Sequence, residues 1–176
     1  VYAFEPAPDN LQILKRNVEL NHLTNVIPIN KAVSDKCATV PFYFRQRTGV
    51  TGSLLAAHQP NESTIAVECV TIDEYLAGKP VDVVKMDIEG GEPHALEGMK
   101  KTMSQSKDMV LFVEFNRSCL LQAGVNQQAF LAQLEKADFE CQVINEELRC
   151  LQPIKPGLGS CNLYCLKEAA KHPVNA

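Results

Sequence analysis

Three apolar segments of the chain end in an acidic residue, and the first two are followed directly by the start of a helix. The segments read "VYAF" before Glu5, "VDVVKM" before Asp87 and "VLFV" before Glu114. Apolar runs of strand length that alternate with helical patterns are typical of α/β proteins, in which helices cover a parallel sheet. The sequence therefore predicts one α/β domain over residues 1–176, with a mostly parallel sheet.

The helices of this domain are predicted from apolar residues spaced three and four positions apart. Asp9 is expected to cap a helix that runs to about His22 and buries Leu11. Glu92 and Pro93 are expected to open a second helix, since proline is tolerated in a first turn, and "NQQAFLAQLEKADF" predicts a third. The last segments, "ECQVINEELRCLQ" and "NLYCLKE", are predicted as shorter strands that form an antiparallel edge.

The composition limits the kinds of partner. The chain has 17 basic and 21 acidic residues, a net charge of −4, so it offers no basic field for nucleic acid or an anionic membrane. No apolar run approaches the ~20 residues of a membrane span, and no basic flank precedes an apolar stretch at the N-terminus. We therefore expect a small-molecule partner and a cytoplasmic location.

The seven cysteines show neither C-x-x-C spacing nor a dense disulfide pattern. Cys161 and Cys165 share a face of a predicted strand, but four residues of strand separate them by roughly 13 Å, too far for a direct bridge. Reduced thiols are expected, with these two cysteines in the core.

Glu5 ends the first predicted strand, and ligands of open α/β sheets bind beyond the carboxyl ends of the strands. A carboxylate at the end of the second strand of a nucleotide-binding unit accepts hydrogen bonds from both ribose hydroxyls. The alternative is a solvated side chain that helps to cap the following helix. The sequence leaves both interpretations open.

The segment "KMDIEGGE" places Lys85, Asp87 and Glu89 on one side of an extended strand, and Gly90 and Gly91 allow a tight turn after it. A Lys–Asp ion pair and a helix-terminal glutamate explain Lys85 and Glu92 without a functional role. At the mouth of a cleft, however, unpaired carboxylates that are removed from water imply a bound partner. A functional role is therefore predicted for Asp87 and Glu89.

No metal site is predicted. Asp87 and Glu89 have the oxygen ligands that hard divalent cations prefer, but the sequence identifies no third ligand. His94, in the first turn of the predicted helix, is a candidate general base, but it is expected to be a surface residue instead.

Several segments together resemble the FkbM-type S-adenosylmethionine-dependent methyltransferases. They are "FEPAPDN", the asparagine of "VELN", "NKAVSD", "VTIDEYL", "VDVVKMDIEGGEPHALEGM" and "VLFVEFN", in this order over roughly residues 1 to 116. The resemblance implies a Rossmann-like class I methyltransferase sheet and S-adenosyl-L-methionine as cofactor. It also implies O-methylation of a saccharide or natural-product-like acceptor.

The resemblance also assigns roles to single residues. Glu5 matches the acid that binds the cofactor ribose, while Lys31 and Ala32 pass along the adenine. Asp87 lies beside the methionine end of the cofactor and the acceptor, and Glu114 lies on the acceptor side. Asp87, Glu89 and Glu114 are therefore the catalytic candidates. The family often has a histidine two residues after the last of these, where this chain has Asn116, so the general base stays open.

Two β-rich segments, "VPFYFRQR" and "STIAVECVTI", predict an antiparallel excursion between residues 40 and 72. One interpretation is that it covers the acceptor; the other is a solvent-facing hairpin with aromatic residues packed beneath it. The residues concerned are Phe42, Tyr43, Phe44, Arg45, Arg47 and the polar loop to His58.

A class I methyltransferase begins its cofactor site on a strand and Gly-rich turn before the segment that corresponds to "VYAFE". No such turn is found here, because the first glycine is Gly49. We therefore expect an N-terminally incomplete methyltransferase domain with unpaired edges on the strands before Glu5 and Asp87, since the missing strand is normally central. Either residues upstream of Val1 complete it, or a second copy pairs with these edges as a homodimer.

Two other functions are compatible with parts of this sequence. The first is a non-catalytic methyltransferase remnant that acts as a binding or dimerisation module. The second, a nicotinamide-dependent dehydrogenase, ranks last because "KMDIEGGE" has no evident part in hydride transfer.

Overall fold

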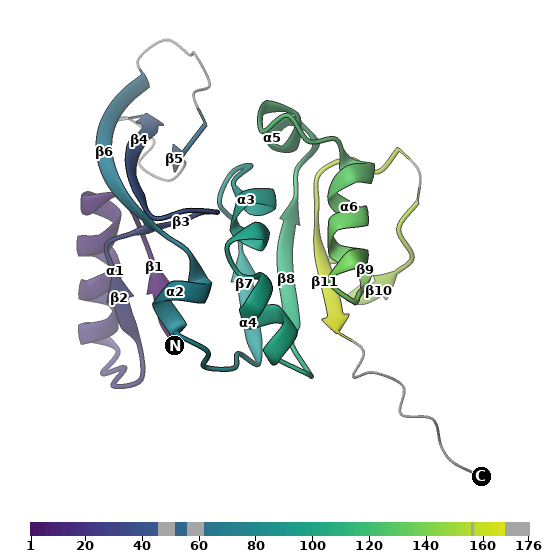
Figure 1. Cartoon of the computed structure of the whole chain (residues 1–176), viewed down its shortest axis with the longest axis horizontal. Helices are drawn as coiled ribbons and strands as arrows, with labels where there is room; N and C mark the ends of the chain where they lie inside the picture. Colours follow the sequence, from purple (N-terminus) through teal and green to yellow (C-terminus); the bar gives the residue numbers. More distant parts are fainter. Residues whose placement is uncertain (46–51, 56–61, 156, 168–176) are drawn as a thin grey trace.

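The computed structural model describes residues 1–45, 52–55, 62–155 and 157–167 (Figure 1). The helices are α1 (Pro8–Leu20), α2 (Ile72–Leu76), α3 (Glu92–Glu97), α4 (Lys100–Gln105), α5 (Arg117–Gln122) and α6 (Gln127–Lys136). The strands are β1 (Tyr2–Phe4), β2 (Ile27–Ile29), β3 (Ala32–Val33), β4 (Ala38–Arg45), β5 (Gly52–Ser53), β6 (Glu62–Val70), β7 (Val83–Met86), β8 (Val110–Phe115), β9 (Phe139–Asn145), β10 (Cys150–Gln152) and β11 (Cys161–Lys167).

The strands form three sheets rather than one. β1 pairs with β2; β10, β9, β11, β8 and β7 form a five-stranded sheet in this order; and β3, β6, β4 and β5 form a third. The α/β class is confirmed, but the expected mostly parallel sheet is wrong, because five of the eight described pairings are antiparallel. Two of these pairings arise because β11 inserts between β8 and β9 and runs antiparallel to both. The antiparallel direction expected for the last strands is therefore confirmed, but β11 lies inside the sheet rather than at its edge.

The main core lies between the five-stranded sheet and three helices. Figure 1 shows α3, α4 and α6 over one face of this sheet. In β8, Leu111, Val113 and Phe115 are buried beneath the helices, whereas the alternate residues Phe112 and Glu114 are partly exposed. Successive side chains of a strand point to opposite faces of the sheet, so β8 buries the face that the helices cover. Of the predicted buried face, Ala95 and Leu96 lie on α3 and Met99 follows it as the cap residue of α4, and all three are at most 1% exposed.

Helix α1 matches the predicted helix in extent but not in its cap. The cap residue is Ala7, Pro8 occupies the first turn, and Asp9 is one residue further along. Asp9 therefore lies within the first turn, where its charge still interacts favourably with the helix dipole. Leu11 is buried as expected.

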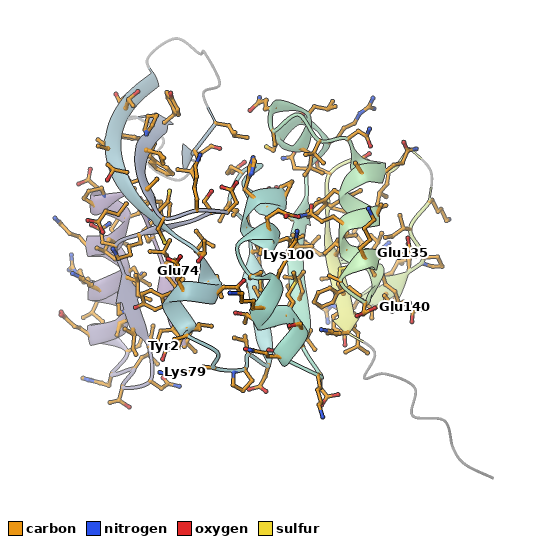
Figure 2. All side chains as sticks on the ribbon, in the orientation of Figure 1. Tyr2, Glu74, Lys79, Lys100, Glu135 and Glu140 are labelled. Atoms are coloured by element: carbon orange, nitrogen blue, oxygen red, sulfur yellow. A yellow bond between two sulfur atoms is a disulfide. The ribbon has the colours of Figure 1, made fainter. Side chains whose placement is uncertain are left out.

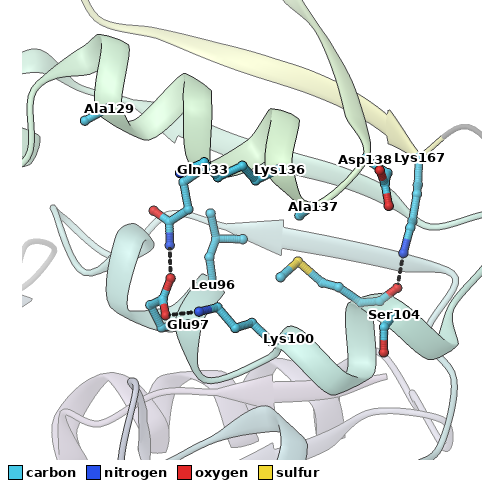
Figure 3. A pocket seen from close by; sticks show the side chains of 11 residues that line it. Leu96, Glu97, Lys100, Ser104, Ala129, Gln133, Lys136, Ala137, Asp138 and Lys167 are labelled. Atoms are coloured by element: carbon cyan, nitrogen blue, oxygen red, sulfur yellow. Dashed lines mark hydrogen bonds and ion pairs between the residues drawn. The ribbon is translucent and has the colours of Figure 1, made fainter.

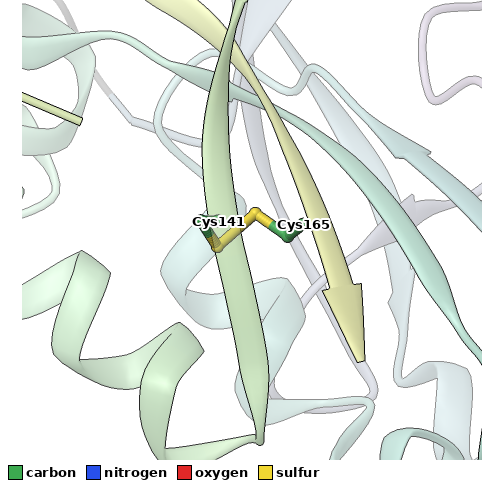
Figure 4. Close-up of a disulfide and its surroundings, with 2 residues drawn as sticks. All are labelled: Cys141 and Cys165. Atoms are coloured by element: carbon green, nitrogen blue, oxygen red, sulfur yellow. A yellow bond between two sulfur atoms is a disulfide. The ribbon is translucent and has the colours of Figure 1, made fainter. Parts of the chain in front are cut away.

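Two cysteines form a disulfide, so the expectation of reduced thiols is wrong for them. Cys141 in β9 and Cys165 in β11 are direct partners in the antiparallel register, with Cα atoms 4.1 Å apart (Figure 4). They are 24 residues apart in sequence, and only the pairing of β9 with β11 brings them together. The other five cysteines are free.

Strands β1 and β7 each have one open edge. In the described part of the chain, β1 pairs only with β2 and β7 only with β8. The predicted unpaired edges are thus present. Tyr75 of α2 packs edge-on against Tyr2 and Phe4 of β1. Tyr2, labelled in Figure 2, nevertheless remains 42% exposed, and Val83 of β7 is 60% exposed. As for membrane insertion, the helices described here are too short or too polar to span a bilayer.

Candidate functional site

A pocket of about 330 Å³ lies where the ends of β1 and β3, the excursion β4–β5 and the turn after β7 meet. Its lining includes five residues that the sequence analysis placed in a site: Glu5, Lys31, Ala32, Asp87 and Glu89. Glu5 and Asp87, which are more than 80 positions apart in sequence, come together here, and each directly follows the last residue of a strand.

Glu5 follows β1 and joins it to the helix that comes next. Its carboxylate Oε1 accepts a hydrogen bond from the N–H of Ala7, the cap residue of α1, at 2.8 Å. Burial raises the pKa of Glu5, and hydrogen bonds from Ala7 and the Asn10 side chain oppose that shift. The two interpretations of Glu5 are therefore compatible, since the same side chain supports the helix start and lines the pocket.

Lys31 and Ala32 form another part of the pocket wall. Lys31 is ion-paired with Glu68 of β6, and its pKa is raised chiefly by this hydrogen-bonded partner. Ala32 is 5% exposed and pairs in parallel with Cys69 of β6. This parallel pairing fixes the backbone of β3 beside the pocket.

Asp87 follows the last residue of β7. Its Oδ2 lies 2.9 Å from the Lys85 ammonium, and both side chains are about half exposed. The predicted Lys–Asp ion pair is confirmed. An exposed pair of this kind is worth little to stability, and Asp87 itself lines the pocket.

Glu89 does not lie on the strand, contrary to expectation. β7 ends at Met86, and Glu89 has φ 53° in a turn where Gly90 follows with φ 94°. A Cβ at Gly90 would lie 2.6 Å from the carbonyl oxygen of Cys119, so this position requires glycine for space as well as conformation. The Cys119 thiol donates to Glu89 Oε2 at 3.4 Å.

Glu92, the first residue of α3, is 1% exposed. Its Oε1 accepts the backbone N–H of Ile88 at 2.9 Å. Burial raises the pKa of Glu92, and hydrogen bonds from backbone N–H groups of the turn oppose this rise. The sequence placed Glu92 correctly at a helix start, but did not predict that its side chain folds back to hold the turn between Asp87 and α3.

Glu114 does not line the pocket, although it is the second-last residue of β8, which runs parallel to β7. Its Oε2 is buried and has no hydrogen-bond partner among the described residues. Burial raises its pKa, and the charges of Asp87 and Glu89 raise it further. Asn116, at the position where the family often has histidine, caps α5 by accepting the Ser118 N–H at 3.1 Å.

The excursion forms one wall of the pocket. Phe42, Gly52 and Leu54 line it, and Phe42 stacks on Phe44 with ring centroids 6.5 Å apart. The antiparallel pairing of β4 with β6 is as predicted. Arg47 and His58 lie outside the described residues, as does the side chain of Arg45.

His94 lies on α3, away from the pocket lining. Its Nδ1 is 3.8 Å from Asp35 Oδ2, and the side chain is 46% exposed, which agrees with a surface residue. Among the described residues, no group of three or more His, Cys, Asp and Glu side chains is placed to hold a metal ion.

A second pocket, of about 430 Å³, lies between α3, α4 and α6 (Figure 3). The Gln133 amide donates to Glu97 at 3.0 Å, Lys100 is ion-paired with Glu97, and Lys167 donates to the Met103 carbonyl. Its polar groups are thus largely paired with one another, and its lining contains none of the predicted site residues.

The family model of the methyltransferase FkbM domain matches residues 1–141 of the chain. This match extends beyond the segments in which the resemblance was found and includes every predicted site residue. No curated protein matches the chain.

The chain is similar in structure to a methyltransferase FkbM from Methylobacillus flagellatus KT, with 17% sequence identity and a TM-score of 0.58. The similarity covers 94% of this chain and 36% of that one, so the chain spans about a third of that protein's length. A precorrin-6y C5,15-methyltransferase from Geobacter metallireducens GS-15 matches at 12% identity and a TM-score of 0.43, covering 94% of this chain and 64% of that one. The similarity to the Methylobacillus flagellatus protein shows a shared fold.

Proposed function

Because the chain belongs to the FkbM methyltransferase family, we propose that its acidic pocket binds S-adenosylmethionine and serves methyl transfer to an acceptor hydroxyl. One observation carries this proposal: a single pocket gathers Glu5, Lys31, Ala32, Asp87 and Glu89. Its volume of about 330 Å³ is within the range of small-molecule sites.

The donor set fits the proposed cofactor. A carboxylate has about four acceptor positions, and the hydrogen bonds from Ala7 and Asn10 leave Glu5 able to accept from ribose hydroxyls. In this proposal Lys31 and Ala32 lie along the adenine, and Asp87 lies beside the methionine end. S-adenosylmethionine supplies a methyl group on a sulfonium.

The chain's own contribution to the reaction is positioning and removal of a proton. In-line displacement gains most from a fixed acceptor oxygen and from excluded water. A carboxylate that takes the hydroxyl proton adds ~10²- to 10⁴-fold. Asp87 and Glu89 line the pocket, and Glu114 is held close enough for their charges to raise its pKa. We propose these three as the catalytic group, with a saccharide or natural-product-like acceptor.

We also propose that a further strand completes the sheet between β1 and β7, whose facing edges are open among the described strands. The strand comes from residues that precede Val1 or from a second copy of the chain. The same edges favour the alternative function, a non-catalytic module that binds or dimerises through them, since exposed strand edges promote association.

The test is a calorimetric titration of S-adenosylhomocysteine into the 176-residue chain, with the mass in solution measured alongside. Micromolar binding supports the proposed cofactor site. A chain that dimerises without binding the ligand supports the non-catalytic module instead. Glu135→Ala is a suitable control variant, because Glu135 is exposed on α6 (Figure 2).

A further inference from the structure

The turn from Ile88 to Gly91 has an unusual backbone. Glu89 and Gly90 are consecutive residues with positive φ, at 53° and 94°. A residue other than glycine is uncommon in this region, and a conformation of this kind persists only where the surroundings enforce it. The question is therefore which contacts hold Glu89 in place.

Two side chains hold the turn from opposite ends. Glu92 accepts the N–H of Ile88 at 2.9 Å. Ser53, in β5 of the excursion, donates its hydroxyl to the carbonyl oxygen of Glu89 at 2.8 Å. The same hydroxyl oxygen accepts the N–H of Leu55 at 3.1 Å. Because a serine hydroxyl has one hydrogen to give, the bond to the Glu89 carbonyl fixes its direction.

The Ser53 contact acts on the peptide that joins Glu89 to Gly90. Gly90 is compatible with both signs of φ, so the orientation of this peptide depends on its hydrogen-bond partners, which are Glu92 for the N–H of Gly90 and Ser53 for the carbonyl oxygen of Glu89. Rotation of this peptide changes ψ of Glu89. It therefore changes the surroundings of the Glu89 side chain, which lines the pocket. A methyl group of Leu55 also lies next to Gly90, 3.1 Å from the position that an added Cβ would occupy. This is a second contact between the excursion and the turn.

We infer that Ser53 is a positioning residue: its hydroxyl fixes the Glu89–Gly90 peptide and thereby aims the Glu89 carboxylate into the pocket. The inference rests on the proposed function, in which this pocket holds the cofactor. It gives the excursion a specific part in the site, because β5 both walls the pocket and determines the conformation of its acidic turn.

The test combines ligand affinity with a measurement on the turn itself. Ser53→Ala should weaken S-adenosylhomocysteine binding about fivefold, the value expected for one hydrogen bond, and should speed amide exchange at Gly90. Ser53→Thr, which keeps the hydroxyl, should bind within about twofold of the unchanged chain. Ser118→Ala is the matched control. Ser118 is exposed, and its hydroxyl makes no hydrogen bond among the described residues.

A double-mutant cycle separates positioning from general stability. If Ser53 acts through Glu89, Ser53→Ala should have no further effect on affinity in a Glu89→Gln background. An equal loss of affinity in both backgrounds, or unchanged exchange at Gly90, would overturn the inference. If the unchanged chain binds no S-adenosylhomocysteine, the proposed function fails, and exchange at Gly90 in Ser53→Ala still decides whether the serine holds the turn.

Discussion

The carboxylate of Glu92 accepts the backbone N–H of Ile88 at 2.9 Å, so the first residue of α3 holds the chain that follows Asp87. The side chain is buried to 1% exposure. The position of the acidic turn therefore depends on a carboxylate that does not itself line the pocket.

Replacing Glu92 by alanine should destabilise the protein. The change leaves the Ile88 N–H without its acceptor and opens space in a buried region, and an unsatisfied buried donor costs about 1–3 kcal/mol. Glu92→Gln keeps an amide oxygen as acceptor and should lose less. Chemical denaturation measures both variants, and a Glu92→Ala protein as stable as the unchanged chain would contradict this role.

Replacing Glu5 by alanine should weaken S-adenosylhomocysteine binding by about 1–3 kcal/mol if Glu5 holds the ribose hydroxyls. Because Glu5 also accepts the N–H of Ala7, circular dichroism must first establish that α1 is retained. Glu135→Ala should bind as the unchanged chain does. Equal affinity of the Glu5 variant would remove Glu5 from the site.

Replacing Glu114 by glutamine should increase stability at neutral pH. The pKa of Glu114 is raised above its ordinary value of 4.5, chiefly by burial, so the folded state binds its proton more tightly than the unfolded chain does. This contribution to stability is complete below the unfolded value and is lost as the pH rises through the folded value. The neutral amide does not ionise and avoids this loss.

Melting temperatures of Glu114→Gln and of the unchanged chain, compared between pH 4 and pH 8, check the prediction. The melting temperature of Glu114→Gln, relative to that of the unchanged protein, should increase as the pH rises. Parallel profiles would mean that Glu114 ionises as easily in the folded protein as in the unfolded chain. Glu5 and Glu92 also have raised pKa values, so some pH dependence of the same sign should remain in the variant.

The order of helices and strands could largely be predicted from the sequence, because it depends on local apolar spacing. The family resemblance, drawn from short segments, is confirmed by the match over residues 1–141. The order of the strands in the main sheet could not be predicted in the same way. Nothing local in "NLYCLKE" indicates that β11 inserts between β8 and β9, and the disulfide of Cys141 with Cys165 is a consequence of that insertion.

The candidate site was predicted in part. Glu5, Asp87 and Glu89 line one pocket, and the sequence indicated them because an acidic residue after an apolar strand is a local pattern. Ser53 and the buried contact of Glu92 were missed, because each depends on which backbone group the side chain meets. The pair of glycines after Glu89 was the available indication that this turn is tightly constrained.

Replacing Val83 by lysine should reduce self-association of the chain. Val83 is 60% exposed on β7, whose edge toward β1 is open among the described strands, and charged residues on an edge oppose pairing with another strand. If copies associate through this edge, the dissociation constant should rise about tenfold or more, which corresponds to 1.4 kcal/mol. Sedimentation over a range of concentrations measures the effect.

Leu148→Lys is the control, since Leu148 is similarly exposed, at 66%, in the turn between β9 and β10. Equal effects of both lysines would indicate association through general surface hydrophobicity, whereas an effect of Val83→Lys alone assigns the contact to the open edge of β7.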